Sequence, residues 1–206
     1  MHSASGLPTH IHIHKLSNMR LTDISQAWLK ESLQQGDIVV DATLGNGFDA
    51  LFLAQRIGEA GQLYGFDVQP QAITQSEILL ADETCFKSFF LKGHEFMASV
   101  LPPEAKGQIK GIMFNLGWLP NSDKSIITKP DTTISAIKQG IDWLAEGGKL
   151  SLMVYPGHQG GDTEAKLVID WVKSCCLKSK GALKCEIVDV PNHPTAPVLL
   201  KISKYA

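Results

Sequence analysis

Short apolar runs alternate along the chain with longer stretches in which apolar residues recur every three or four positions. The short runs are rich in β-branched and aromatic residues, a composition typical of buried strands. They predict seven strands, which we place at residues 37–43, 62–68, 89–95, 110–119, 149–155, 184–190 and 197–203.

The longer stretches have the period of amphipathic helices. They predict helices at residues 23–33, 48–58, 70–83, 130–148 and 162–177. In the second of these, Phe48, Leu51 and Phe52 are expected to face the core. The fourth is expected to end at Gly147–Gly148, because glycine commonly follows the last helical turn.

The alternation of strands and helices predicts an α/β fold, with a mainly parallel sheet and helices on both faces. No helix separates the last two predicted strands, so we expect them to form an antiparallel hairpin at one edge of the sheet. A single domain over residues 21–206 accounts for the pattern, and residues 1–20 form an N-terminal extension. Ligands bind such sheets beyond the carboxyl ends of the strands, so the residues that follow strands are the functional candidates.

Composition narrows the class of protein. The chain has 206 residues, 44% hydrophobic and 19% charged, with a net charge of −2, which suits one globular domain. No apolar stretch reaches the roughly 20 residues that span a bilayer, and no secretory signal is evident. The four cysteines form no C-x-x-C pair, so we expect reduced thiols and a cytoplasmic location with no membrane partner.

A glycine-rich turn lies in "VVDATLGNGFDALFLA", between a predicted strand and a predicted helix. Residues 45–50 fit the pattern G-x-G-x-x-G/A, which alone is a weak indication of a nucleotide-like cofactor. Asp67, at the end of the next strand, is placed to bind a ribose hydroxyl pair. Asp41 lies just before the turn, where a carboxylate would repel the pyrophosphate of a dinucleotide. S-adenosylmethionine carries positive charge and no phosphate, so the pattern favours this methyl donor over a nicotinamide.

The acceptor is expected beside Asn115, which ends the fourth predicted strand. Its side-chain oxygen is suited to accept a hydrogen bond from an amine and to orient the nitrogen lone pair. Because methyl transfer is a direct displacement, positioning and desolvation should supply most of the catalysis. Trp118 is suited to stack on an RNA base, although core packing is an equally good interpretation.

Four segments resemble the putative rRNA methylase family: the glycine-turn segment, "YGFDVQPQAI", "MFNLGWLPNSDKSIITKPDTTISAI" and "YPGHQGGDTEAKLV". The resemblance runs from about Leu21 to the C-terminus. This family includes a bacterial enzyme that methylates 5-aminomethyl-2-thiouridine at the tRNA wobble position. The resemblance implies a class I, Rossmann-like methyltransferase fold, S-adenosylmethionine as cofactor, and transfer of a methyl group to the uridine amine of tRNA. The net charge of −2 predicts a small footprint on the tRNA, the anticodon arm. The family usually has histidine where this chain has Phe48, and serine where it has Gly93.

The turn pattern and the resemblance together give an expected site. Catalysis is assigned to Asn115, Tyr155 and His158. Cofactor binding is assigned to Asp41, Thr43, Gly45, Asn46, Gly47, Asp49, Asp67, Gln69, His94 and Asn115. Substrate binding is assigned to Leu116, Gly117, Trp118, Lys124 and Lys129.

Two alternatives to a tRNA methyltransferase stay open at this point. The same fold could act on rRNA or on a small molecule, or the chain could be a nicotinamide oxidoreductase or a silent nucleotide-binding module. Methyltransferases of this size often pair, so a homodimer is one expectation. No metal site is expected: His10, His12 and His14 share one face if extended, but no carboxylate or cysteine is nearby in sequence. A mobile or edge segment is the favoured interpretation of these histidines.

Overall fold

The computed structural model describes residues 8–12, 20–117, 128–157, 160–190 and 193–205. Within them, eight strands form one sheet in the order β1-β7-β8-β6-β5-β2-β3-β4. The strands are β1 (Thr9–His12), β2 (Ile38–Asp41), β3 (Gln62–Asp67), β4 (Phe86–Leu91), β5 (Ile109–Asn115), β6 (Leu144–Val154), β7 (Leu183–Asp189) and β8 (Val198–Lys204). The helices are α1 (Leu21–Lys30), α2 (Phe48–Ile57), α3 (Pro70–Leu79), α4 (Met97–Val100), α5 (Pro130–Trp143) and α6 (Gly161–Lys178), with short 3-10 turns η1 (His94–Phe96) and η2 (Pro103–Ala105).

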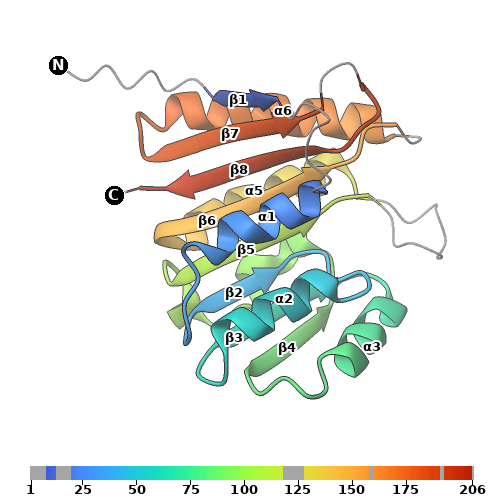
Figure 1. The fold of residues 1–206 in the computed structure, drawn as a ribbon, viewed down its shortest axis with the longest axis vertical. Coiled ribbons are helices and arrows are strands. Elements are labelled where there is room, and N and C mark those ends of the chain that lie inside the picture. The colour runs from blue at the N-terminus through green and yellow to red at the C-terminus, as the bar shows by residue number, and fades with distance from the viewer. Residues whose placement is uncertain (1–7, 13–19, 118–127, 158–159, 191–192, 206) are drawn as a thin grey trace.

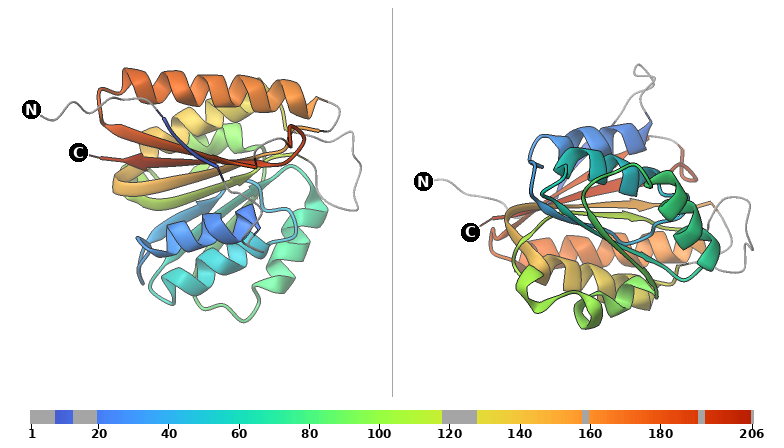
Figure 2. Two further views of the ribbon diagram at one scale, coloured as in Figure 1. Left: turned by 45° about the horizontal axis from the view of Figure 1, so that its top comes forward. Right: turned by 90° about the horizontal axis from the view of Figure 1, so that it is seen from below.

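The sheet lies between two layers of helices (Figure 1). Helices α1, α2 and α3 cover one face, and α4, α5 and α6 cover the other (Figure 2). Strand β8 runs antiparallel to both of its neighbours, β6 and β7, whereas the other described strand pairs are parallel. The predicted α/β fold with a C-terminal antiparallel hairpin is therefore confirmed.

The edge of the sheet differs from the prediction. Strand β1 pairs in parallel with β7, with Thr9 opposite Glu186, so the hairpin is covered at this edge and the sheet has eight strands rather than seven. Residues 9–12 are too few for their pattern to distinguish a strand from an irregular segment. This strand is stabilised by its pairing with β7, which the pattern of these residues does not show.

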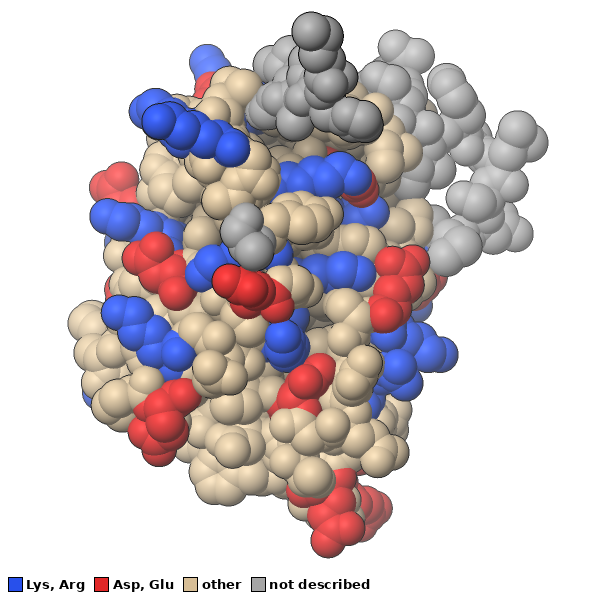
Figure 3. Space-filling model, turned by 90° about the vertical axis from the view of Figure 1, so that its left-hand side faces the viewer, with Lys and Arg blue, Asp and Glu red and all other residues tan. Residues whose placement is uncertain are grey.

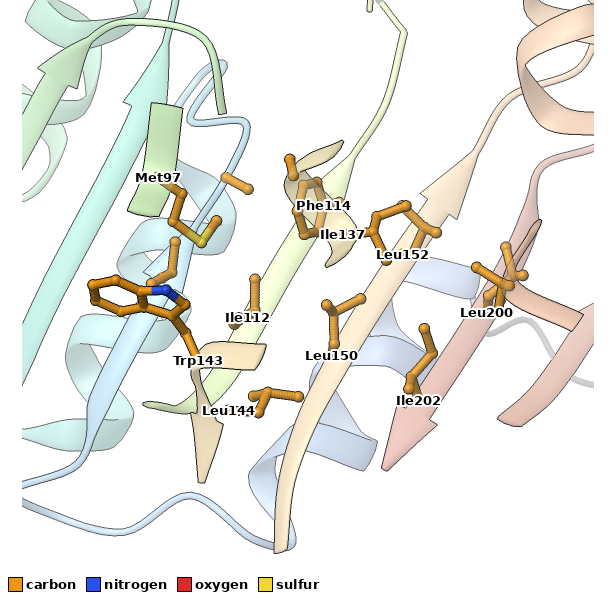
Figure 4. Packing of buried hydrophobic residues seen from close by; sticks show 14 of the residues in the cluster. Met97, Ile112, Phe114, Ile137, Trp143, Leu144, Leu150, Leu152, Leu200 and Ile202 are labelled. Carbon is orange, nitrogen blue, oxygen red and sulfur yellow. The ribbon is translucent and has the colours of Figure 1, made fainter. Parts of the chain in front are cut away.

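The core has two main parts, one on each face of the sheet. Alternate residues of a strand point to opposite faces, so Ile112 and Phe114 of β5 join the cluster beneath α5 and α6, whereas Met113 joins the cluster beneath α1 and α2. Figure 4 shows the first cluster, in which Leu150 and Leu152 of β6 continue the row from β5. Full burial of each such large side chain contributes about 1.5–3 kcal/mol.

Two local predictions were wrong. Helix α5 ends at Trp143 instead of Gly147, because Leu144 already pairs with Ile109 of β5. Phe48 does not face the core: it is the first residue of α2, and 66% of it is exposed. The sulfur atoms of Cys176 and Cys185 lie side by side across the α6–β7 connection, and Cys85 and Cys175 are free thiols.

The carboxyl ends of the parallel strands lie at the right of Figure 1. Figure 3 shows the opposite side of the molecule, where Lys and Arg alternate with Asp and Glu instead of forming a field of one sign. No helix in the described part of the chain is long and apolar enough to cross a membrane.

Candidate active site

A cavity of about 970 Å³ opens at the carboxyl ends of β2, β3, β5 and β6. Strands β2 to β4 follow one another in one direction across the sheet, and β5 and β6 follow in the other. The cavity therefore lies where the strand order reverses, between β2 and β5, which is the usual ligand position in sheets of this kind.

The glycine turn connects β2 to α2 and forms one wall of the cavity. Gly45 and Gly47 have φ values of 53° and 82°, in the left-handed region that glycine adopts without strain. Asp67 fixes the turn to the end of β3, because its carboxylate accepts hydrogen bonds from the backbone N–H groups of Gly45 and Gln69, both at 2.9 Å. Gly45 and Asp67 both line the cavity, as the sequence predicted.

Gly47 is needed for the conformation and packing of the turn rather than for contact with a ligand. It does not line the cavity. A Cβ at this position would lie 2.9 Å from Oγ of Ser76 and 3.1 Å from its Cα. Gly47 is thus required by its positive φ and by the packing of the turn against α3.

Asp41 lies beneath the turn with only 1% of its surface exposed. Its Oδ1 accepts a hydrogen bond from the Thr43 N–H at 3.0 Å, whereas its Oδ2 has no partner of normal geometry within the described residues. Burial, and then the nearby charge of Asp49, raises the pKa of Asp41 well above its ordinary value. A buried, incompletely satisfied carboxylate is costly, so this position favours a cationic ligand over an anionic one.

Asn115 and Asp49 meet at the centre of the cavity. Asn115 Nδ2 lies 3.4 Å from Asp49 Oδ2, a long hydrogen bond, and Gln26 Nε2 donates to Asp49 Oδ1 at 2.9 Å. Because an ionised carboxylate only accepts, the Asn115 amide presents its nitrogen to Asp49, and its oxygen can accept from a donor such as the neighbouring Tyr155 hydroxyl. Burial raises the pKa of Asp49, although the hydrogen bonds from Gln26 and Asn115 oppose this.

Tyr155 follows β6 and lines the same part of the cavity. Burial and the charge of Asp49 raise the pKa of its phenol, while a hydrogen bond with Asn115 lowers it. The phenol therefore stays protonated at neutral pH and serves as a hydrogen-bonding group.

His94 lies in η1, after β4, with 7% of its surface exposed. Its Nδ1 is 3.3 Å from the carbonyl oxygen of Ala42, and its ring contacts the edge of Phe114. Burial lowers its pKa, so the imidazole is neutral at physiological pH. It lines the cavity near Asp67 as a polar, uncharged wall.

The end of β5 is held by three different elements. The backbone N–H of Asn115 donates to Thr43 Oγ1 at 2.7 Å, that of Leu116 to the Met153 carbonyl at 3.0 Å, and that of Gly117 to Thr128 Oγ1 at 3.0 Å. Three consecutive amides are thus fixed by the glycine turn, by β6 and by the segment that leads into α5.

Most of the expected residues come together. Those that line the cavity are Thr43, Gly45, Asn46, Asp49, Asp67, Gln69, His94, Asn115, Leu116, Gly117, Lys129 and Tyr155. Asp41 and Gly47 lie behind the wall. Trp118, Lys124 and His158 lie outside the described residues, as do the side chain of His12 and the whole of His14.

One wall of the cavity was not predicted from the sequence: it comes from α1 and its N-cap. Arg20, Thr22, Asp23 and Gln26 line the cavity there. These residues are polar positions of an amphipathic helix, and solvent exposure is the ordinary interpretation of such positions. The hydrogen bond from Gln26 to Asp49 places α1 at the cavity. It could not be predicted from the sequence, because it depends on how α1 packs beside α2.

The residues around the cavity fit S-adenosylmethionine. Asp41, Asp49 and Asp67 place three carboxylates around the turn, which suits a ligand with a sulfonium and an ammonium group and opposes a pyrophosphate. Within the described residues, no group of three or more histidine, cysteine, aspartate or glutamate side chains is arranged to hold a metal ion.

Comparison with known proteins agrees with this geometry. A family model described as putative rRNA methylase matches residues 63–201. The chain is 35% identical over 205 residues to the chloroplastic tRNA (mnm(5)s(2)U34)-methyltransferase of Arabidopsis thaliana, which covers 90% of this chain and 69% of that protein.

Solved structures give the same result. A putative rRNA methylase from Clostridium thermocellum superimposes with a TM-score of 0.84 at 33% identity, covering 92% of this chain and 100% of the other. A putative methyltransferase from Streptococcus mutans, in complex with SAH, gives 0.79 at 31% identity, covering 91% and 99%. The resemblance and the methyltransferase fold expected from the sequence are both confirmed: the chain belongs to the putative rRNA methylase family.

Proposed function

We propose that this chain is an S-adenosylmethionine-dependent methyltransferase that N-methylates the amine of 5-aminomethyl-2-thiouridine at the wobble position of tRNA. The observation that carries the proposal is the position of Asn115, whose amide lies in the cavity between Asp49 and Tyr155 at the carboxyl end of β5. The Arabidopsis relative, which is named for this nucleoside, supports the choice of acceptor.

The residues of this chain have distinct tasks in the proposed reaction. When bound, the cofactor would supply a methyl group on a sulfonium: the amine nitrogen would bond to the methyl carbon as the carbon–sulfur bond breaks and the thioether leaves. Asp67 and the turn would hold its ribose, and Asp41 would offer negative charge beneath it. Asn115 would accept a hydrogen bond from the acceptor amine and orient the lone pair, with Tyr155 beside it. A buried site also lowers the pKa of the bound amine and so favours its reactive, neutral form.

A second function is favoured by the description of the family, which names rRNA. The two functions share the fold, the cofactor and the chemistry, and they differ in the RNA that reaches the cavity. A nicotinamide oxidoreductase is disfavoured by family membership and by the carboxylates around the turn.

Several further expectations stay predictions. The anticodon arm is the proposed part of the tRNA, and Lys129 at the cavity mouth is a proposed backbone contact. Trp118, Lys124 and His158 keep their predicted roles, as does the homodimer. The cytoplasm is the predicted location; the Arabidopsis relative is named chloroplastic.

The test offers the purified protein and the methyl donor to two RNAs from cells that accumulate the unmethylated amine: their tRNA and their rRNA. Nucleosides are then analysed by mass spectrometry. We expect conversion of the 5-aminomethyl to the 5-methylaminomethyl nucleoside in tRNA, and loss of this product with Asn115→Ala, which should leave donor affinity nearly unchanged. Methyl incorporation into rRNA alone would replace the tRNA proposal with the second function.

A further inference from the structure

Glu164 of α6 is a buried carboxylate outside the expected site. Only 4% of it is exposed, and it does not line the cavity. Its Oε1 accepts a hydrogen bond from the Thr133 hydroxyl at 2.8 Å, and its Oε2 accepts one from the Thr128 hydroxyl at 2.7 Å. A buried carboxylate is retained only where its oxygens are satisfied, and here two threonines satisfy them.

Thr128 connects this carboxylate to the end of β5. The Thr128 hydroxyl accepts the Gly117 N–H at 3.0 Å, and the Thr128 N–H donates to the Gly117 carbonyl at 3.2 Å. A threonine hydroxyl has one proton to donate. Because the Thr128 hydroxyl donates this proton in its hydrogen bond to Glu164, a lone pair of the hydroxyl oxygen is directed at the Gly117 N–H.

Gly117 lies two residues beyond Asn115, and Asn115, Gly117 and Thr128 all line the cavity. The φ of Gly117 is 119°, a conformation in which glycine has many alternatives close in energy. The two hydrogen bonds between Thr128 and Gly117 therefore fix one backbone conformation directly after Asn115.

We propose that Glu164 is a positioning residue for the proposed methyl transfer, acting through Thr128 to fix the end of β5 and, with it, the Asn115 side chain that receives the acceptor amine. This inference rests on the proposed function. The alternative is that Glu164 only joins α6 to α5 through Thr133, in which case its loss would change stability and nothing else.

The test compares variants of Thr128, where the positioning and the packing roles separate. Thr128→Val keeps the shape and removes the hydroxyl that joins Gly117 to Glu164, whereas Thr128→Ser restores a hydroxyl at the same place. Ser151→Ala is the matched control, because Ser151 makes a buried hydroxyl–hydroxyl hydrogen bond with Ser25, at 2.5 Å, and does not line the cavity.

We measure kcat and KM for the tRNA, donor affinity by calorimetry, the melting temperature, and hydrogen exchange of the peptide that contains Gly117. Thr128→Val should lower kcat about tenfold or more, the factor that corresponds to ~1.4 kcal/mol, with donor affinity nearly unchanged and faster exchange at Gly117. Thr128→Ser should recover most of the turnover. Ser151→Ala should lower the melting temperature and leave kcat and Gly117 exchange as in the wild type.

Glu164→Gln supplies the second arm, because one amide oxygen must then serve two hydroxyl donors. Its effect on kcat should have the same direction as that of Thr128→Val, and the double variant should lose little more than Thr128→Val alone, as expected of residues in one network. Wild-type turnover or unchanged Gly117 exchange in Thr128→Val would overturn the positioning role. A wild-type protein that methylates neither RNA would instead overturn the proposed function and this role with it.

Discussion

Asp41→Asn is expected to raise the free energy of unfolding of the cofactor-free protein. The same substitution is expected to lower its affinity for the methyl donor. The substitution keeps an oxygen for the Thr43 N–H, which Asp41 accepts at 3.0 Å, and removes a negative charge that is almost fully buried. The Oδ2 atom that becomes the amide nitrogen has no hydrogen-bond partner of normal geometry within the described residues. The wild-type chain thus carries a buried charge that the variant lacks, and the N–H groups of Thr43 and Ala50 compensate for that charge only in part.

The magnitude follows from the cost of an unsatisfied buried group, roughly 1–3 kcal/mol and more when it is charged. We expect Asp41→Asn to raise the free energy of unfolding by about 1–3 kcal/mol at pH 7. The loss of the charge beneath a cationic donor should cost a similar amount of binding, which corresponds to a roughly 5- to 150-fold weaker donor affinity.

The gain in stability should depend on pH. Burial and the charge of Asp49 raise the folded pKa of Asp41 above that of the unfolded chain, about 3.9. The stability linked to the protonated form is therefore fully present below the unfolded pKa and is lost as pH rises through the folded pKa. The difference between Asp41→Asn and the wild type should be small near pH 3.5 and should grow toward neutral pH.

The assay is urea denaturation of both proteins at several pH values, with calorimetric titration of the donor at pH 7. The reasoning would be refuted if the Asp41→Asn variant were less stable than the wild type at pH 7. It would also be refuted if the variant bound the donor as tightly as the wild type does. In the first case Oδ2 would have a partner; in the second, its charge would not act on the donor.

Three further predictions concern the rim and the turn. Gly47→Ala should destabilise the protein by about 2–4 kcal/mol, measured by denaturation, because a left-handed φ costs a non-glycine residue roughly 1–2 kcal/mol and its Cβ would contact Ser76 at 3.1 Å or less; unchanged stability would contradict the packing argument. Phe48→Ala should raise the KM for tRNA by about 5- to 150-fold if the exposed ring stacks on a base, with little change in melting temperature because the side chain is exposed; an unchanged KM would remove Phe48 from the acceptor site. Lys129→Met should weaken tRNA binding and reduce the slope of log affinity against log salt by about 1 if it contacts a phosphate; an identical slope would exclude that contact.

Much of the site was predictable because strand ends converge. Asp41, Asp67 and Asn115 each end a strand that periodicity identified, and a parallel sheet brings such ends to one edge. The glycine turn supplied the remaining constraint, since its pattern is local in sequence. These two facts predicted that Asp67 lies near the turn, whereas its hydrogen bond from the Gly45 N–H is known only from the structure.

The parts that were missed depend on contacts between distant elements. Gln26 reaches Asp49 because α1 packs beside α2, and Thr128 reaches Glu164 because α5 packs beside α6. The hydrophobic period of a helix shows which of its faces is buried. It does not show which polar residue on the other face points into a cavity. Phe48 illustrates the same limit, since its apolar side chain was assigned inward while it lies at the rim.

Strand β1 has a consequence for handling the protein in solution. It covers the backbone edge of β7, whose N–H and C=O groups would otherwise be open to pairing with another chain. A version of the protein that starts after residue 12 would expose this edge next to the buried residues of β7, and self-association through strand addition would be the result to watch for in purification. A tag placed at the C-terminal end leaves that cover in place.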